Sequence, residues 1–315
     1  MNKRIIVSTI GKIILLEVLL MIPALLVSLI YGDGDTMGFL ITMVPAGIAG
    51  AAFTSVKQSG QRMSSRDGYF IVASAWILIS LIGALPLYIN GGFASYWDAL
   101  FEIVSGFTTT GASILAAPEE LGHGVLFWRS FTHWIGGMGV LVFLLMVMPM
   151  ENDNSMHLVR AEVPGPTAGK LVPRMRTTSM ILYGIYGIMT LILVVLLCLF
   201  GMKPFDSFCI AFGTAGTGGF AVSSAGIAGY NSLAIEVTLG IFMLLFGVNF
   251  TVYHLIMLRK IKDALFMEGV RAYFAIVAAA TVAITWNILS FAGGLGNALR
   301  QAFFQVTSII TTTGF

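Results

Sequence analysis

The chain has 315 residues, of which 57% are hydrophobic and only 10% are charged, and its mean hydropathy is +0.91. Soluble domains carry charge on about a quarter of their residues, so this composition excludes an ordinary soluble protein and predicts an integral membrane protein. The net charge of +2 is small, and the basic residues form no cluster that would bind phosphates. Nucleic acid is therefore not expected as a partner.

Seven apolar runs are long enough for a helix that crosses a bilayer, which takes about 20 residues. They lie near residues 10 to 31, 37 to 56, 69 to 89, 125 to 149, 178 to 201, 232 to 258 and 271 to 291. No small-residue cleavage site follows the first run, so we interpret it as a retained helix rather than a signal peptide.

The basic residues predict the orientation of these crossings. If the crossings alternate from a cytoplasmic N-terminus, only Arg129, Lys203 and Arg300 of the 17 lysines and arginines lie outside. The positive-inside rule therefore favours a multi-pass protein with its N-terminus in the cytoplasm. The acidic loops Gly32–Asp35 and Glu119–Glu120 then lie outside. They either concentrate cations near an entrance or carry ordinary solvated charge, and we favour the second interpretation.

Three further apolar segments, 95 to 111, 204 to 218 and 298 to 314, are too short to cross and end in small residues that close on glycine. In the first and third, the glycine lies twelve positions after an alanine, and Phe101, Glu102 and Ser105 match Phe304, Gln305 and Ser308. This is an internal repeat. Short helices followed by irregular backbone at membrane depth are tolerated where they line a watery path, so the repeat predicts an ion pore.

The closing residues of each segment are the predicted ion-binding residues of a selectivity filter. Backbone carbonyls there would replace the hydration shell of K⁺, and glycine allows the close approach that this needs. The residues are Thr108, Thr109, Thr110, Gly111, Ala215, Gly216, Thr217, Gly218, Thr311, Thr312, Thr313 and Gly314. Threonine hydroxyls could add oxygens. Close packing of small helix residues is the competing explanation, but three copies favour the filter. No transition-metal site and no organic cofactor are expected.

Several polar residues accompany these segments. We expect Asp98 and Asp206 near the starts of their helices, where the helix dipole favours a carboxylate, and Pro204 in a first helical turn. Glu102 is either a functional carboxylate at membrane depth or a hydrogen-bond partner of a neighbouring loop, and we favour the loop. Arg129 is expected near the membrane surface, paired with an external carboxylate or a backbone carbonyl.

Other residues have structural interpretations. Gly136, Gly137 and Gly139, next to His133, predict tight packing of the fourth crossing behind the filter. Asn249 and His254 interrupt the sixth crossing and suggest an interhelical bond or a pore wall. Cys198 and Cys209 are interpreted as buried apolar residues rather than a disulfide or metal site.

Several motifs together resemble one known family. They are Arg66-Asp-Gly68, Gly83-Ala-Leu-Pro86, Thr108-Thr-Thr-Gly-Ala-Ser113, His133-Trp-Ile-Gly-Gly-Met-Gly139 and Arg160-Ala-Glu-Val-Pro-Gly-Pro166. They resemble the TrkH membrane subunits of bacterial Trk-type potassium uptake systems, in the Trk/Ktr/HKT superfamily. The resemblance implies four helix, pore-loop, helix repeats around one ion path, a homodimer in the bacterial inner membrane, surrounded by membrane lipid, and a cytoplasmic nucleotide-binding regulatory partner of the TrkA kind.

The predicted fold class is an all-α integral membrane protein, K⁺ channel-like, with two leading transmembrane helices followed by such repeats. The expected segments are an N-terminal two-helix unit (1–68), pore repeat 1 (69–150), a cytoplasmic linker (151–177), pore repeat 2 (178–262) and pore repeat 3 (263–315). Within the linker, Arg160, Glu162, Lys170 and Arg174 either contact a regulatory partner or are solvated. Because the chain stops after the third segment, the third repeat is incomplete and the fourth missing, and we expect a fragment of a longer protein.

The predicted function is potassium transport across a membrane by a pore-forming subunit. An enzyme is not expected, because no nucleophile with a base and no phosphate-cradling loop occurs in the sequence. The alternative is a secondary transporter that couples K⁺ to H⁺ or Na⁺. Such transporters are typically built from inverted repeats, whereas these three segments are expected to share one orientation.

Overall fold

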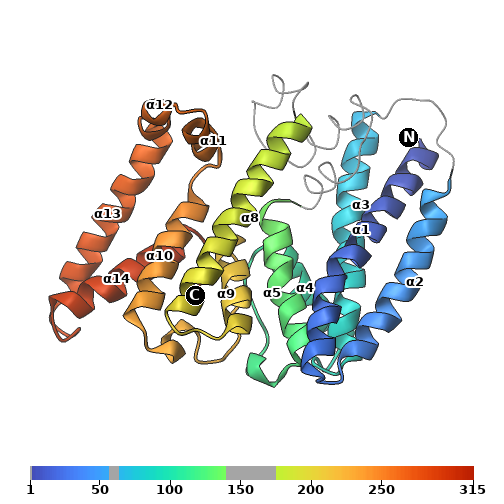
Figure 1. Cartoon of the computed structure of the whole chain (residues 1–315), viewed down its shortest axis with the longest axis horizontal. Helices are drawn as coiled ribbons and strands as arrows, with labels where there is room; N and C mark the ends of the chain where they lie inside the picture. The colour runs from blue at the N-terminus through green and yellow to red at the C-terminus, as the bar shows by residue number, and fades with distance from the viewer. Residues whose placement is uncertain (1, 57–63, 140–174) are drawn as a thin grey trace. The chain divides into compact units, whose positions relative to one another are not determined.

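The computed structural model describes residues 2–56, 64–139 and 175–315 (Figure 1). Within these ranges the regular structure is helical, with no strand. Five helices are long and apolar enough to cross a membrane, or up to six if one bent pair forms a single span. Both observations agree with a helical membrane protein. The chain divides into two compact units, residues 1–108 with 112–180, and residues 109–111 with 181–315.

The described helices of the first unit form one packed group. They are α1 (Lys3–Tyr31), α2 (Thr36–Thr54), α3 (Ser65–Ile89), α4 (Tyr96–Phe107), the short 3₁₀ helix η1 (Pro118–Glu120) and α5 (His123–Gly137). Helix α1 packs against α2, α3 and α5, and α4 lies between α3 and α5. Gly11 of α1 lies against the backbone of α2 so closely that a Cβ atom there would be 2.8 Å from the Gly50 carbonyl oxygen.

Local sequence explains where these helices begin. The Asn2 side chain accepts a hydrogen bond from the Ile5 amide, which starts α1 earlier than the apolar run alone predicts. Ser64 and Asp67 form a reciprocal capping box at the start of α3. The Ser95 hydroxyl accepts from the Asp98 amide at the start of α4, so Asp98 lies in the first turn as predicted.

The acidic loop between α1 and α2 has a structural role that the sequence did not indicate. Asp33 accepts hydrogen bonds from the backbone amide of His123 (2.7 Å) and from its ring Nδ1 (2.6 Å). Asp35 is buried, accepts from the amide of Val125 (3.0 Å) and bonds the Ser28 hydroxyl. Both carboxylates therefore bind the N-terminal amides of α5. The interpretation of these two residues as ordinary solvated charge is wrong.

The second unit contains most of α8 and all of the later helices. They are α8 (Met175–Leu199), α9 (Pro204–Ala215), the 3₁₀ helix η4 (Ile227–Tyr230), α10 (Leu233–Gly247), α11 (Thr251–Met257), α12 (Ile261–Leu265), α13 (Glu268–Ile288) and α14 (Leu295–Ile310). Helix α14 packs against α10 and α13, and α9 packs against α10. Pro204 is the first residue of α9, and Asp206 lies in its first turn, as predicted.

The run 232 to 258 is not one continuous crossing. Helix α10 ends at Gly247, and α11 begins at an angle of 91° to it. Asn249 is exposed, and its side chain accepts a hydrogen bond from the Thr251 amide (2.9 Å), which starts α11. The described hydrogen bond of Asn249 is therefore local and is not the predicted interhelical bond, whereas the pore wall stays a prediction. The hydroxyls of Tyr253 and Tyr273 donate to the Leu245 and Leu244 carbonyls in the last turn of α10, and the Leu245 carbonyl also accepts from the Val248 amide.

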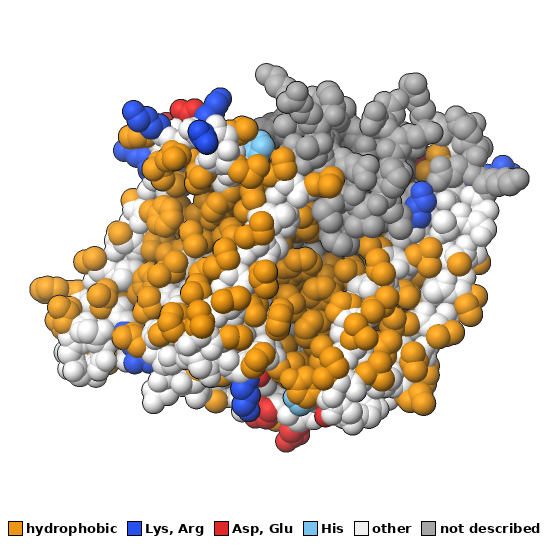
Figure 2. All heavy atoms as spheres, in the orientation of Figure 1, with side chains coloured by type: hydrophobic (Ala, Val, Ile, Leu, Met, Phe, Trp, Pro, Cys, Tyr) orange, Lys and Arg blue, Asp and Glu red, His pale blue; other side chains and the backbone are white. Residues whose placement is uncertain are grey.

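The outer surfaces of the long helices are apolar. Figure 2 shows hydrophobic side chains over the middle of the helices, with charged side chains near their ends. Large exposed side chains include Leu26, Ile77, Leu191 and Ile276. An exposed apolar surface of this extent suits contact with lipid rather than water. The second half of the fourth predicted crossing and most of the predicted linker, with Arg160, Glu162, Lys170 and Arg174, lie outside the described residues.

We predict that Asp33→Asn weakens the start of α5. The hydrogen bond from the His123 amide lowers the pKa of the Asp33 carboxyl below its ordinary value of 3.8. The carboxylate therefore stabilises the fold above that value, and this contribution is lost as the pH falls through the lower folded pKa. The variant should lose about 0.5–2 kcal/mol of unfolding free energy at neutral pH, the range for a lost helix cap. Below about pH 4 the difference should shrink.

Thermal melting in detergent between pH 3 and pH 7 measures both effects. Glu120→Gln serves as a control, because Glu120 is an exposed acidic residue of the loop that leads into α5. Equal melting of Asp33→Asn and the wild type across this range would contradict the capping role.

Candidate functional site

Three short helices, α4, α9 and α14, end in turns with the same backbone conformation. In each turn a threonine and the glycine two positions later have positive φ angles. The pairs are Thr109 and Gly111 (54° and 75°), Thr217 and Gly219 (54° and 72°), and Thr312 and Gly314 (60° and 82°). Positive φ is uncommon for threonine, so its repetition at one position shows that the three turns are structural copies. We call them turn 1 (108–111), turn 2 (216–219) and turn 3 (311–314).

The second turn lies one residue later than the sequence predicted. Ala215 is the last residue of α9, and Gly219 rather than Gly218 has the position of Gly111 and Gly314. The prediction took the first glycine of the Gly218-Gly219 pair as the closing residue and so missed Gly219. One signal could have corrected it. Gly219 lies twelve positions after Ser207, which is the spacing of the other two copies.

Turns 2 and 3 also share their hydrogen bonds. The amides of Gly218 and Gly219 donate to the Gly213 carbonyl of α9 at 2.9 and 3.2 Å. The amides of Thr313 and Gly314 donate to the Ser308 carbonyl of α14 at 2.9 and 3.3 Å. In a trans peptide the N–H and C=O groups point in opposite directions. The carbonyls that precede these amides, including those of Gly218 and Thr313, therefore point away from their own helices.

These carbonyls contact the neighbouring turn, and the contact repeats. The Gly218 carbonyl oxygen lies so close to Gly111 that a Cβ atom on Gly111 would collide with it. The Thr313 carbonyl oxygen would collide in the same way with a Cβ atom on Gly219. Since Gly218 and Thr313 are equivalent, as are Gly111 and Gly219, turn 3 contacts turn 2 as turn 2 contacts turn 1. Head-to-tail contacts of this kind arrange copies around an axis.

Threonine hydroxyls support the turns from the helix side. Thr108 and Thr311 occupy the same position and donate to carbonyls of their own helices, at 2.6 Å to Val104 and 2.7 Å to Thr307. The Thr311 hydroxyl also lies 2.8 Å from that of Thr313. Each hydroxyl proton is thus used within the protein, while an oxygen lone pair remains available to a ligand.

A buried ion pair holds the chain that leaves turn 1. Glu102 of α4 and Arg129 of α5 are 0% and 2% exposed, and Arg129 Nε lies 2.6 Å from Glu102 Oε1. Glu102 also accepts hydrogen bonds from the Ser113 hydroxyl (2.8 Å) and the Ile114 amide (3.2 Å). The prediction that Glu102 bonds a neighbouring loop is confirmed. The sequence predicts Arg129 near the membrane surface, paired with an external carboxylate or a backbone carbonyl, but its partner is the buried Glu102.

The residue before turn 1 is packed tightly. A Cβ atom on Gly136 of α5 would collide with the Phe107 carbonyl oxygen, which confirms close packing of this helix against the end of α4. The Phe107 ring is 2% exposed and makes an edge contact with Trp128, at 6.0 Å between ring centroids. Backbone contact through a glycine fixes Phe107, and with it the end of α4.

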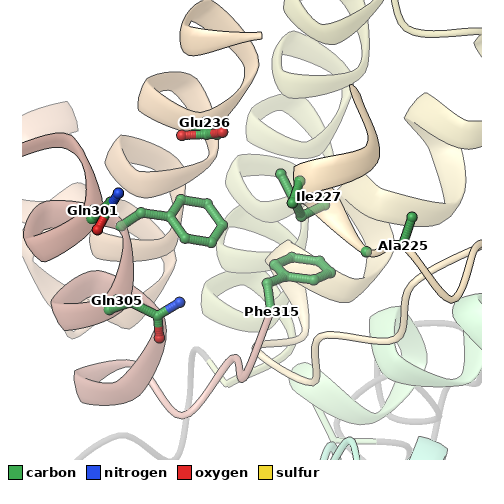
Figure 3. Close-up of a pocket in the computed structure, with 9 residues that line it drawn as sticks. Ala225, Ile227, Glu236, Gln301, Gln305 and Phe315 are labelled. Atoms are coloured by element: carbon green, nitrogen blue, oxygen red, sulfur yellow. The ribbon is translucent and has the colours of Figure 1, made fainter. Parts of the chain in front are cut away.

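A pocket lies beside turn 3 in the second unit (Figure 3). Glu236, Gln301 and Gln305 lie on one side, Ala225 and Ile227 on the other, with the ring of Phe315 between them. Arg300 binds both carboxylate oxygens of Glu236, at 2.6 and 2.5 Å. This pairing neutralises the acidic group of the pocket, so the pocket does not resemble a cation site.

The described residues contain no group of three or more histidines, cysteines or acids that could hold a metal ion. Cys209 is buried and Cys198 is half-buried, and both are free thiols. The site is therefore built from backbone oxygens and threonine hydroxyls. These are neutral, hard oxygen atoms that suit an alkali cation.

Comparison with known proteins identifies one family. The sequence model of the family described as TrkH, cation transport protein, matches residues 36–295. The Trk system potassium uptake protein TrkH of Escherichia coli K12 is 34% identical over 324 residues, which cover 100% of this chain and 66% of that protein. The protein TrkG of the same organism is 33% identical, covering 99% of this chain and 65% of its own length.

A solved structure is also similar. The crystal structure of the potassium transporter TrkH from Vibrio parahaemolyticus matches with a TM-score of 0.85 and 30% identity, over 100% of this chain and 66% of that one. The chain thus spans about two thirds of the length of these relatives.

We predict that Arg129→Met destabilises the first unit by about 3–5 kcal/mol, because it leaves the Glu102 carboxylate buried without its ionic partner. The double variant Glu102→Met with Arg129→Met should regain part of that loss, since it removes both buried charges. Thermal melting in detergent measures the change. Lys203→Met, at an exposed site, is the control. A single variant as stable as the wild type would contradict the importance of this pair.

Proposed function

Because this chain belongs to the TrkH family of cation transport proteins, we propose that it forms part of a pore through which potassium ions cross a membrane. Its relatives in Escherichia coli are named potassium uptake proteins, which supports K⁺ as the ion. The proposed role is passive conduction rather than catalysis. We also propose that the three pore repeats predicted from the sequence, 69–150, 178–262 and 263–315, each contribute to this pore.

The observation that carries the proposal is the repeated contact between turns. The Gly218 carbonyl oxygen lies against Gly111 of turn 1, and the Thr313 carbonyl oxygen lies against Gly219 of turn 2, so equivalent oxygens of separate segments each contact the next turn. Converging carbonyls can replace the water lost by an alkali cation, without the strong binding that a carboxylate would give. The proposed ligands are the carbonyls of residues 108–111, 216–219 and 311–314. Turn 2 has Gly216 where turns 1 and 3 have Thr108 and Thr311, and Gly218 where they have Thr110 and Thr313, so its wall lacks two hydroxyls.

The short helices support ion binding electrostatically. Each of α4, α9 and α14 presents its C-terminal end to its turn, and that end carries a partial negative charge. Asp98 and Asp206 occupy first turns, where a carboxylate offsets the opposite, positive end. The ends of α9 and α14, which lie in one unit, would favour a dehydrated cation beside turns 2 and 3.

The resemblance implies a fourth turn, and the geometry is compatible with one. If the rotation from turn 1 to turn 3 continued, the next carbonyl would lie against Gly314. No described atom lies within 4 Å of a Cβ position on Gly314. We also propose, from the family resemblance, a homodimer in a bacterial inner membrane with a TrkA-like regulatory partner. The basic residues favour a cytoplasmic N-terminus.

A transporter coupled to H⁺ or Na⁺ is not favoured. Secondary transporters typically place broken helices of opposite orientation around a midplane site. Here turns 1, 2 and 3 share one backbone conformation, turns 2 and 3 share one hydrogen-bond pattern, and the same head-to-tail contact joins turn 3 to turn 2 and turn 2 to turn 1. A rotational repeat of this kind suits a pore.

We predict that Gly219→Ala lowers K⁺ flux into proteoliposomes by about tenfold or more, the effect of adding roughly 1.4 kcal/mol to the barrier. The new Cβ atom would collide with the Thr313 carbonyl and displace a proposed ligand. Gly201→Ala is the matched control. Gly201 also has a positive φ angle (94°), but no described atom lies within 4 Å of its Cβ position.

The control separates displaced carbonyls from backbone strain, since both variants place alanine at a positive φ angle. Flux equal to the wild type in a folded Gly219→Ala protein would refute the filter. So would equal losses in both variants.

A further inference from the structure

Glu17 is a buried carboxyl group that the proposed pore does not use. It is the central residue of α1 (Lys3–Tyr31), which places it about 21 Å from either end at a rise of about 1.5 Å per residue. Its exposed fraction is 3%. Neither carboxyl oxygen has a hydrogen-bond partner among the described residues.

The surroundings of this carboxyl are apolar and lie directly behind turn 1. A Cβ atom on Gly83 of α3 would be 3.1 Å from Glu17 Oε1, 3.2 Å from the Phe107 ring and 3.3 Å from Ile103. The carboxyl thus faces α3 and the end of α4. The Gly83 carbonyl already accepts from the Trp128 indole (3.0 Å). Phe107 is the residue before Thr108, so a change at Glu17 reaches the start of turn 1 through one ring.

No described ion pair or hydrogen bond joins the Glu17 carboxyl to a charged group on the neighbouring helices. Helix α2 carries no charged residue, and the ionisable acidic, basic and histidine residues of α1, α3, α4 and α5 are Lys3, Arg4, Lys12, Arg66, Asp67, Asp98, Glu102, His123, Arg129 and His133. Glu102 pairs with Arg129, and His123 with Asp33. Asp67 bonds the Asn2 amide and Ser64. None of the ion pairs described in the structure includes Glu17.

An ionised carboxylate at this place would be expensive. Burying an unpaired charge costs far more than burying a neutral polar group, and water cannot solvate it at the bilayer centre. We propose that Glu17 is a proton-binding site, held as a neutral carboxylic acid behind turn 1. Loss of its proton would place a negative charge against Gly83 and Phe107 and would disturb the packing of that junction.

The link to transport rests on the proposed function. If turn 1 forms part of the ion path, ionisation of Glu17 lowers K⁺ flux by displacing Phe107. The proton itself is neither carried with K⁺ nor consumed. It acts by keeping the junction of α1, α3 and α4 uncharged.

Infrared spectroscopy of the reconstituted protein tests the proton site without any transport measurement. The wild type at pH 7 should show the carbonyl stretch of a neutral carboxylic acid, which is distinct from that of a carboxylate. Glu17→Gln should lose this band. Glu120→Gln, which changes an exposed glutamate, should keep it. Absence of the band in the wild type, or its persistence in Glu17→Gln, would overturn the proposal.

A second measurement tests the effect of ionisation on folding and flux. As the pH rises from 7 to 10, the melting temperature and K⁺ flux of the wild type should fall more than those of Glu17→Gln, whose side chain stays neutral. Identical pH profiles would overturn the proposed effect on packing. If neither protein conducts K⁺, the proposed pore fails, while the infrared band and melting profile still decide whether Glu17 holds a proton.

Discussion

The structure depends on one close contact, that of a backbone carbonyl oxygen with the Cα atom of a glycine in the next turn. At Gly111 and Gly219 no side chain fits, because a Cβ atom would occupy the place of the neighbouring oxygen. The same glycines have positive φ angles. Two independent requirements, space and backbone conformation, thus fall on one residue in turn 1 and on one residue in turn 2. The turns can approach one another this closely only because both requirements are met.

The three turns share a backbone but differ in their supports. The chain that leaves turn 1 is held at Ser113 and Ile114 by the buried pair of Glu102 from α4 and Arg129 from α5. The corresponding stretch after turn 2 is tied differently, since the Tyr230 hydroxyl donates to Asp206 of α9 (2.9 Å). At turn 3 the Ser308 hydroxyl donates to the Phe315 carbonyl (3.2 Å). Irregular backbone at membrane depth needs such partners because lipid supplies none. Different side chains meet the same need in each copy.

Much of this was predictable from the sequence, and the misses have physical causes. Short helices and their turns follow from local residues, so α4, α9 and α14 lie in the predicted segments. The exact position of turn 2 could not be predicted from local residues, because the adjacent Gly218 and Gly219 both satisfy the same local pattern. The break after Gly247 was also missed. It depends on hydroxyls of Tyr253 and Tyr273, from outside α10, that bond its last carbonyls. The caps that Asp33 and Asp35 provide for α5 join residues about 90 positions apart, which no local pattern reveals.

Two glutamates near turn 1 show how surroundings decide the charge of a carboxyl in a membrane protein. Glu102 has Arg129 and two further hydrogen-bond donors, so its negative charge is compensated. Glu17 faces a glycine, an aromatic ring and an isoleucine, which offer nothing to a negative charge. Both groups contact the α4 segment that ends at Phe107. Glu102 reaches this segment with its charge paired to Arg129, whereas Glu17 has no described partner and, as we propose, keeps its proton. If turn 1 lines the ion path, ionisation of Glu17 would reach that path through the Phe107 ring.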